Sequence, residues 1–403
     1  MRRHNGIILA GLALSLWGLT ACGTSADEGQ LADDQTAQSL TEWEQHADIF
    51  NNDISEEALY EKAKTEGKVV LYSGSSRCEA VAEAFMEKYP GITVEAFDIS
   101  INELIEKVSR EYTAGVHNAD VIHVKDMDGS LYNEYVLEKK FYNYQPSDIC
   151  AHIDESLLKY QTPLYIELGQ WFYNTEAYPD GSPIDSVWDL TRPEWRGRVM
   201  MVNPADNMSN MSLITGYTLD ETAAELEALY EEEFGEPLVL SADCRNAGYE
   251  FLKRLRQNDP IFATNSDEIA ESVGTAGQKN PPVGLLASSK LRKVQQNGWT
   301  MAPINIKPNT GIPQVNTLYI VEGCEHPYAA KLLIRFMMGE ADGKSAGYAQ
   351  FNTLGGWPVR DDVEPPEGAV PYDELLVDTF DPMAIYENIG EVQDFWLLAA
   401  KDA

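Results

Sequence analysis

The polar residues of this sequence that could bind a small molecule come directly after short apolar segments. They are hydroxyls, amides and basic side chains, which donate hydrogen bonds to phosphate or carboxylate oxygens. Backbone N–H groups at the start of a following helix would favour an anion as well. The candidate ligand-binding residues are Ser73, Ser75, Ser76, Arg77, Lys125, Asn203, Asp206, Asn207, Thr264, Asn265, Ser266, Ser288 and Ser289. Arg77 and Lys125 would supply positive charge, with Lys290 as a further candidate.

The segments around the first of these residues predict alternating strands and helices. Ser55 is a typical residue to cap a helix over 55–65, and Gly67 a typical residue to end it. The strands are expected at 68–73, 92–97 and 119–124, and the helices between them at 79–89 and 102–112. This βαβαβ order predicts a parallel sheet with right-handed crossovers. Ligands of such sheets bind beyond the carboxyl ends of the strands, where the candidate residues lie.

Residues 165–290 repeat this pattern and predict a second α/β lobe. The apolar segments 198–202, 261–263 and 282–287 each end in hydroxyl or amide residues, followed by a helix start. Two lobes with facing polar strand ends would enclose a cleft. Trp171 or Trp357 could stack on a sugar ring there, whereas Trp188 and Trp195 are expected to pack within a lobe.

The charge of the chain excludes some classes of partner. Its 403 residues include 30 Lys and Arg against 65 Asp and Glu, a formal net charge of −35. Such a chain repels phosphate backbones, so we expect no nucleic-acid partner.

Enzyme motifs are missing from the sequence. The histidines, among them His117, His123, His152 and His326, are scattered without metal-ligand spacing. A Gly-x-Ser-x-Gly elbow and a P-loop are both lacking. We therefore expect no catalytic residue, no metal and no cofactor. A phosphoester-acting enzyme and a surface sensor or adhesion module are kept as alternatives of other classes.

The first residues resemble an export signal. Arg2 and Arg3 precede an apolar run within residues 1–21. The sequence Leu-Thr-Ala-Cys that ends at Cys22 resembles a bacterial lipobox. This resemblance implies a lipoprotein cut before Cys22, with acyl chains such as palmitate anchoring it to the bacterial cell membrane. We expect residues 22–48 to form a flexible tether and the body to be extracytoplasmic, on the cell surface or in the periplasm. An ordinary signal peptide with a chance cysteine is the alternative.

Four further cysteines are even in number, which permits two disulfides outside the cytoplasm. They are Cys78, Cys150, Cys244 and Cys324. Isolated buried thiols are an equal alternative, and the spacing assigns no pairs.

Four stretches resemble the substrate-binding proteins of bacterial ABC importers, in the branch with ferric-iron, phosphonate and hexose-phosphate binders. They are residues 69–74 with 85–95, 119–121, 188–204, and 326–336 with 355–360. The resemblance implies the type II periplasmic-binding-protein fold, an α/β fold whose two lobes close about a hinge. It assigns 49–164 and 301–345 to lobe 1 and 165–300 and 346–403 to lobe 2. The chain would cross between lobes at 165–174 and return at 301–318. It also implies a monomer that delivers its solute to a membrane permease.

The class of ligand is indicated by the positions at which the iron-binding relatives would carry their metal ligands. Where they carry histidine, glutamate and a tyrosine pair, this chain has Ser76, Lys125 and Ser288-Ser289. A dehydrated cation facing Lys125 in a closed cleft would be repelled. We therefore expect a small anionic solute, such as a phosphorylated sugar, a phosphonate or an organic acid. Ferric or chelated iron is the alternative.

Overall fold

The computed structural model describes residues 39–340, 342–377 and 381–399. Residues Thr41–Ala403 form one compact unit, which is described below. The expected signal segment and Cys22 lie outside the described residues. Within the described part of the chain, no helix combines the length and apolar character needed to cross a membrane.

The first half of the body confirms the expected βαβαβ unit. Strand β1 (Lys68–Ser73) pairs in parallel with β2 (Thr93–Asp98) and with β3 (Val121–Lys125). The crossovers are α3 (Cys78–Lys88) and α4 (Ile101–Thr113), at the positions where the sequence predicted helices over 79–89 and 102–112.

The helix before β1 follows its predicted caps. Helix α2 (Glu56–Glu66) begins where the Ser55 hydroxyl accepts a hydrogen bond from the Ala58 N–H, and it ends at Gly67, whose φ is 72°. It packs on α12 (Pro327–Met338).

Residues 41–48, which the sequence assigned to the tether, are folded instead. Helix α1 (Glu42–His46) starts with a capping box between Thr41 and Glu44. Its Trp43 indole donates to the Cys324 carbonyl over 3.0 Å.

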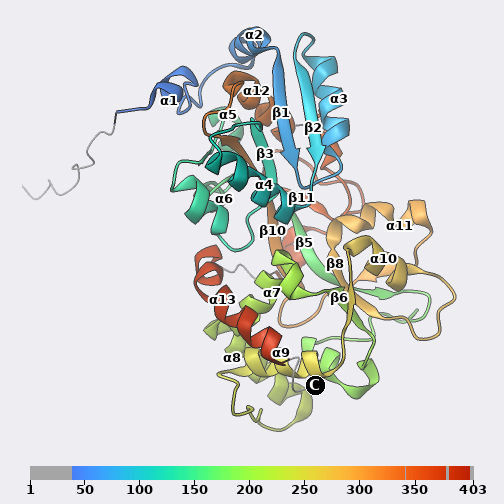
Figure 1. Cartoon of the computed structure of the whole chain (residues 1–403). Coiled ribbons are helices and arrows are strands. Elements are labelled where there is room, and N and C mark those ends of the chain that lie inside the picture. Colours follow the sequence, from blue (N-terminus) through green and yellow to red (C-terminus); the bar gives the residue numbers. More distant parts are fainter. Residues whose placement is uncertain (1–38, 341, 378–380, 400–403) are drawn as a thin grey trace, which may run out of the picture. The chain divides into compact units, whose positions relative to one another are not determined.

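Two long strands connect the halves of the sheet. Strand β5 (Thr162–Asn174) runs antiparallel to β10 (Gly311–Val321), with a register shift at Asn316/Thr317. Figure 1 shows this pair between the β1–β3 end of the sheet and the β6–β8 end. The main order is β2-β1-β3-β10-β5-β8-β6-β7. The remaining strands are β4 (Phe141–Tyr142), β6 (Val199–Val202), β7 (Ile261–Ala263), β8 (Val283–Ala287), β9 (Met301–Pro303) and β11 (Gly356–Pro358).

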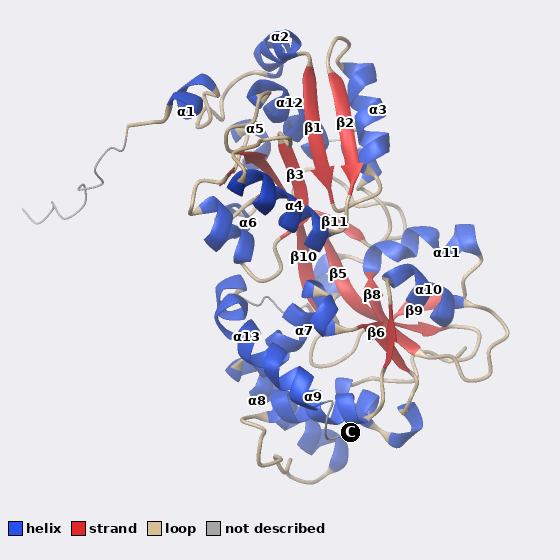
Figure 2. Cartoon of the chain, in the orientation of Figure 1, coloured by secondary structure: helices blue, strands red, loops and turns tan. Residues whose placement is uncertain are grey.

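Helices flank both ends of this sheet (Figure 2). The remaining helices are α5 (Ser147–Cys150), α6 (Glu155–Leu158), α7 (Met208–Thr218), α8 (Asp220–Phe234), α9 (Ala247–Gln257), α10 (Ser266–Gly274), α11 (Leu291–Asn297) and α13 (Pro382–Ala399). Short turns include a π-helical turn at Tyr132–Val136 and a 3₁₀ turn at Ser288–Lys290. Helix α13 packs on α7 and α9.

Two large hydrophobic cores lie on either side of the β5–β10 pair. The first contains Phe85 and Phe336, and the second contains Trp188 and Trp396. Residues 348–363 contribute to the first core, whereas Ile304, Ile306 and Ile312 contribute to the second. Both expected lobe boundaries, at 301 and at 346, therefore lie too early in the chain. The segment that follows residue 301 stays with the second core because β9 pairs with the end of β5.

The tryptophans and cysteines are mostly structural. Trp188 and Trp195 are buried in the second core as expected. Trp171 lies in the same core and Trp357 in a smaller cluster, so neither is placed to stack on a ligand. Among the described residues the cysteines are free buried thiols, namely Cys78, Cys150, Cys244 and Cys324.

Candidate functional site

A cavity of about 330 Å³ lies where the ends of β1, β3 and β8 meet β5, and we call it the strand-end cavity. It is lined by loops from both halves of the body, which the sequence placed at strand ends. The predicted residues that line it are Ser75, Ser76, Arg77, Lys125, Asn207, Thr264, Asn265, Ser266 and Ser289. Their convergence follows from the parallel order of β1, β3, β6, β7 and β8 within their halves.

Arg77 is held in place at one wall of the cavity. Its guanidinium donates to the Ser75 hydroxyl over 3.1 Å and to the Tyr165 hydroxyl over 2.5 Å. The same group lies 5.0 Å from the ring centres of Tyr165 and Phe351. Stacking and hydrogen bonding together fix its orientation, because a planar guanidinium can use both at once.

Arg292 brings a second guanidinium to the cavity from the first turns of α11. It donates to the Ser289 carbonyl over 2.5 Å. Burial and the nearby charge of Arg77 lower the pKa of Arg292, although an arginine stays protonated at neutral pH. Across residues 39–340, 342–377 and 381–399, neither Arg77 nor Arg292 forms an ion pair with a carboxylate. An anion in the cavity would therefore relieve their mutual repulsion.

The two lysines of the cavity are neutralised by acidic partners, unlike the arginines. Lys125 forms an ion pair with Glu167 of β5 and donates to Gln314 over 2.8 Å. Burial alone would raise the pKa of Glu167, but Lys125 and Arg77 outweigh it and hold that pKa well below its usual range. Lys290 pairs with Asp267 over 2.8 Å. The expectation that Arg77, Lys125 and Lys290 supply free charge is corrected for the two lysines, which are paired, whereas Arg77 and the unpredicted Arg292 have no carboxylate partner among the described residues.

Some predicted residues lie outside the strand-end cavity. Ser73 is fully buried, 2.9 Å from His123 Nδ1. Ser288 is also fully buried, because its hydroxyl accepts from the Leu168 N–H and donates to the Gly355 carbonyl. Asn203 accepts from the Trp396 indole over 3.0 Å. Asp206 is exposed and accepts from Asn203 over 3.0 Å, and it lines a neighbouring groove.

The amides that do line the cavity also cap helices. Asn207 caps α7 by accepting from the Asn210 N–H over 2.9 Å. Asn265 caps α10 by accepting from the N–H groups of Asp267 and Glu268, each over 3.0 Å. Their side-chain oxygens are thus occupied. Ser75, Ser76 and Ser266 also line the cavity, and of these the Ser75 hydroxyl already accepts from Arg77.

Several residues of the cavity were not among the candidates. Tyr165, Glu167, Arg292 and Asn316 line it together with the predicted set. Tyr165 and Glu167 belong to β5, which the sequence identified only as a crossing between lobes. A charged Glu167 inside an otherwise apolar run is the signal that could have marked this position, since buried carboxylates are rare without a partner.

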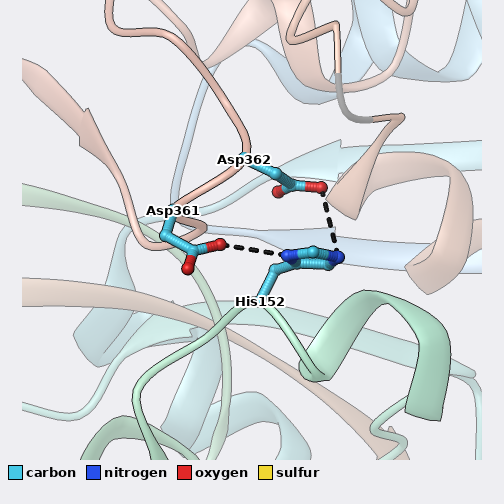
Figure 3. Close-up of side chains that lie close together, drawn as sticks. All are labelled: His152, Asp361 and Asp362. Atoms are coloured by element: carbon cyan, nitrogen blue, oxygen red, sulfur yellow. Dashed lines mark hydrogen bonds and ion pairs between the residues drawn. The ribbon is translucent and has the colours of Figure 1, made fainter.

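One cluster elsewhere has the residue types of a metal site. His152 lies between Asp361 and Asp362, with its Nδ1 3.0 Å from one carboxylate and its Nε2 3.7 Å from the other (Figure 3). One ligand atom from each residue lies within 4.8 Å of the others, but the two carboxylates face opposite ring nitrogens, so a shared ion would require a side chain to turn. Asp362 is also paired with Arg360 over 2.8 Å. The arrangement fits an ion-pair network.

Comparison with known proteins adds to this geometry. Residues 80–374 match the family model described as bacterial extracellular solute-binding protein. The chain belongs to this family. No curated protein matches the chain in sequence. Family membership places the body of this solute-binding protein outside the cytoplasm.

Solved structures confirm the type II periplasmic-binding-protein fold of this solute-binding protein. Iron-bound HitA from Pseudomonas aeruginosa is 16% identical, with a TM-score of 0.60, covering 82% of this chain and 99% of its own. AfuA from Actinobacillus pleuropneumoniae, with fructose 6-phosphate bound, is 16% identical with a TM-score of 0.61, covering 84% and 99%. The Trichodesmium protein with iron and citrate is 14% identical with a TM-score of 0.58, covering 83% and 99%.

Proposed function

We propose that this solute-binding protein captures a small anionic solute in the strand-end cavity and delivers it to the permease of an ABC importer. The observation that carries the proposal is the pair of guanidiniums at Arg77 and Arg292, which have no carboxylate partner among the described residues. A phosphoryl or carboxyl group would accept their hydrogen bonds in a fork geometry that suits guanidinium.

The proposed mechanism is closure of the two halves on the solute. The solute would bridge Ser75–Arg77 of the first half and Thr264–Ser266 of the second, on opposite walls of the cavity. A ligand that contacts both walls stabilises the closed form more than the open form, and so shifts the population between them. The closed form would then dock on the permease as a monomer.

The donor set of the cavity disfavours the iron alternative. Its carboxylates, Glu167 and Asp267, are both engaged with lysines. Tyr165 accepts a hydrogen bond from Arg77, and burial raises its pKa far above the usual range, so the phenolate that Fe(III) prefers is hard to form. A ferric ion would meet two guanidiniums instead of hard anionic ligands.

Calorimetry and thermal shift with a panel of anions test the proposal. The panel is inorganic phosphate, glucose 6-phosphate, 3-phosphoglycerate, methylphosphonate, acetate and ferric citrate. Ferric nitrilotriacetate is added because it presents the same iron on a different chelator. A bound anion at 100 times its Kd raises the free energy of unfolding by about 2.7 kcal/mol. We expect at least one iron-free anion to bind. Binding of ferric nitrilotriacetate alone would favour the iron alternative.

A matched pair of arginine variants locates the binding. Arg292→Gln should weaken anion binding by about tenfold or more, since it removes a charge-assisted hydrogen bond. Arg196→Gln is the control, because Arg196 is exposed and does not line the cavity. Equal affinities in both variants would remove Arg292 from the site.

We also propose that Cys22 anchors the protein to the membrane through acyl chains. The support is the lipobox-like sequence that ends at Cys22. Metabolic labelling with a palmitate analogue should mark the wild-type chain in the membrane fraction. Cys22→Ser should lose the label and appear in the soluble extracytoplasmic fraction, and retention of the label would contradict the proposal.

A further inference from the structure

A second, larger groove adjoins the strand-end cavity. It has a volume of about 690 Å³ and runs along the first turns of α4, so we call it the α4 groove. The two hollows share Lys125, Val202, Asn207 and Thr264 as lining residues. They are therefore neighbouring parts of one cleft, and a ligand could occupy both.

The walls of the α4 groove differ in chemistry from those of the strand-end cavity. Ile101 and Ile105 contribute from α4, Met127 and Leu131 from the loop after β3, and Met208 from the start of α7. Met208 is 42% exposed, so its side chain offers apolar surface that a ligand in the groove could cover. Apolar side chains thus line both halves of the body along this groove.

Several polar groups of the α4 groove are already engaged with neighbouring residues. Glu106 pairs with Arg110 over 3.3 Å at its exposed rim. Asp128 is 5% exposed and accepts from the Ser130 hydroxyl over 2.7 Å. A ligand part in the groove would therefore meet mainly apolar surface, in contrast to the guanidinium-lined cavity beside it.

We infer that the solute is amphiphilic: its anionic group sits in the strand-end cavity, and an apolar arm extends past Lys125 into the α4 groove. This inference rests on the proposed function and specifies the solute as an alkyl- or aryl-bearing phosphate, phosphonate or carboxylate. The continuity of the two hollows and their opposite chemistry support one ligand with two ends. Combined, they exceed the space that a compact hexose phosphate fills.

Matched short and long anions test the inference by calorimetry. The pairs are methylphosphonate with hexylphosphonate and acetate with heptanoate. Each methylene removed from water favours binding about fourfold, so burying only two of the added methylenes gives a gain of about tenfold or more for the long member. Ile105→Ser and Met208→Ser should reduce that gain while leaving the affinity for the short member unchanged. Leu137→Ser is the control, because Leu137 is 57% exposed and lies outside the groove.

The outcomes separate the inference from the proposed function. If the short anions bind and the long ones bind no tighter, the inference is overturned and the proposed function stands. An equal gain in wild type, Ile105→Ser and Met208→Ser would place the arm elsewhere and overturn the inference as well. If no member of either pair binds but another iron-free anion of the panel does, the inference is overturned and the proposed function stands. If no iron-free anion binds at all, the proposed function fails and the inference fails with it.

Discussion

Lys125 and Glu167 form an ion pair within the strand-end cavity that joins the end of β3 to β5. Glu167 is 3% exposed, so its carboxylate is separated from water and depends on this partner. The pair connects two elements of the sheet next to the region that is proposed to bind the solute. A lysine that the sequence marks as a ligand contact is thus also a structural residue.

Lys125→Met should lower the free energy of unfolding by about 3 kcal/mol, because it leaves a buried carboxylate without its closest counter-charge. Denaturant unfolding measures this loss. The double variant Lys125→Met/Glu167→Gln should recover most of it, since a neutral amide no longer needs the ammonium. A single variant as stable as wild type would contradict the structural role of the pair.

Arg77→Lys separates charge from geometry at the other wall. Lysine keeps the positive charge but loses the hydrogen bond to Tyr165 and the stacking on Phe351. We expect anion affinity to fall by about tenfold with little change in melting temperature. Titration of the variant with whichever anion binds wild type gives the answer, and unchanged affinity would show that charge alone is enough.

Gly355 lies directly against the backbone of Ser288 and Ser289. Its φ is 83°, and a Cβ there would lie 1.9 Å from the Ser288 carbonyl oxygen. Gly355→Ala should cost about 2 kcal/mol or more in unfolding free energy and should weaken anion binding, because the 3₁₀ turn of the cavity wall must shift. The control is Gly390→Ala in α13, where a Cβ meets nothing within 4 Å. It should stabilise the helix by about 0.5 kcal/mol. Equal stabilities of the two variants would contradict this account.

His326 makes part of the stability depend on pH. It occupies the N-cap position of α12, and its ring lies 3.0 Å from the Asp120 carboxylate. That hydrogen bond raises the pKa of His326 against the opposing effect of burial. The stabilisation is complete below the pKa of an unfolded histidine, near 6.5, and is lost as the pH rises through the folded value. The free energy of unfolding of the wild type should exceed that of His326→Gln by about 1 kcal/mol at pH 5.5 and by less at pH 9. A difference that grows with pH would refute the assignment.

The sequence was sufficient for the strands and helices of the first βαβαβ unit and for the strands β6, β7 and β8. Apolar runs between turn residues located β1, β3 and β8 to within two residues, and Ser55 and Gly67 located both ends of α2. These features are local, so the backbone requirements of each element are written in neighbouring residues.

The cavity depended on information that is not local. Ser288 and Ser289 are adjacent, yet only Ser289 reaches the cavity, because successive side chains point in different directions and Ser288 is used between β5 and the Gly355 loop. The partners of Lys125 and Lys290 come from other elements. Sequence could therefore indicate which strand ends converge, but it could not say which cations would be left without acidic partners.

The docking of α1 has a practical consequence for recombinant forms of this protein. Glu44 accepts from the Tyr142 hydroxyl over 2.8 Å and pairs with Lys139 over 3.0 Å. A shortened protein that starts after this helix would leave Tyr142 and Lys139 without this acceptor and would remove the carbonyl that accepts from the Ile49 N–H. Expression should therefore start upstream of Thr41, so that purification yields a sample whose thermal behaviour reflects the intact body.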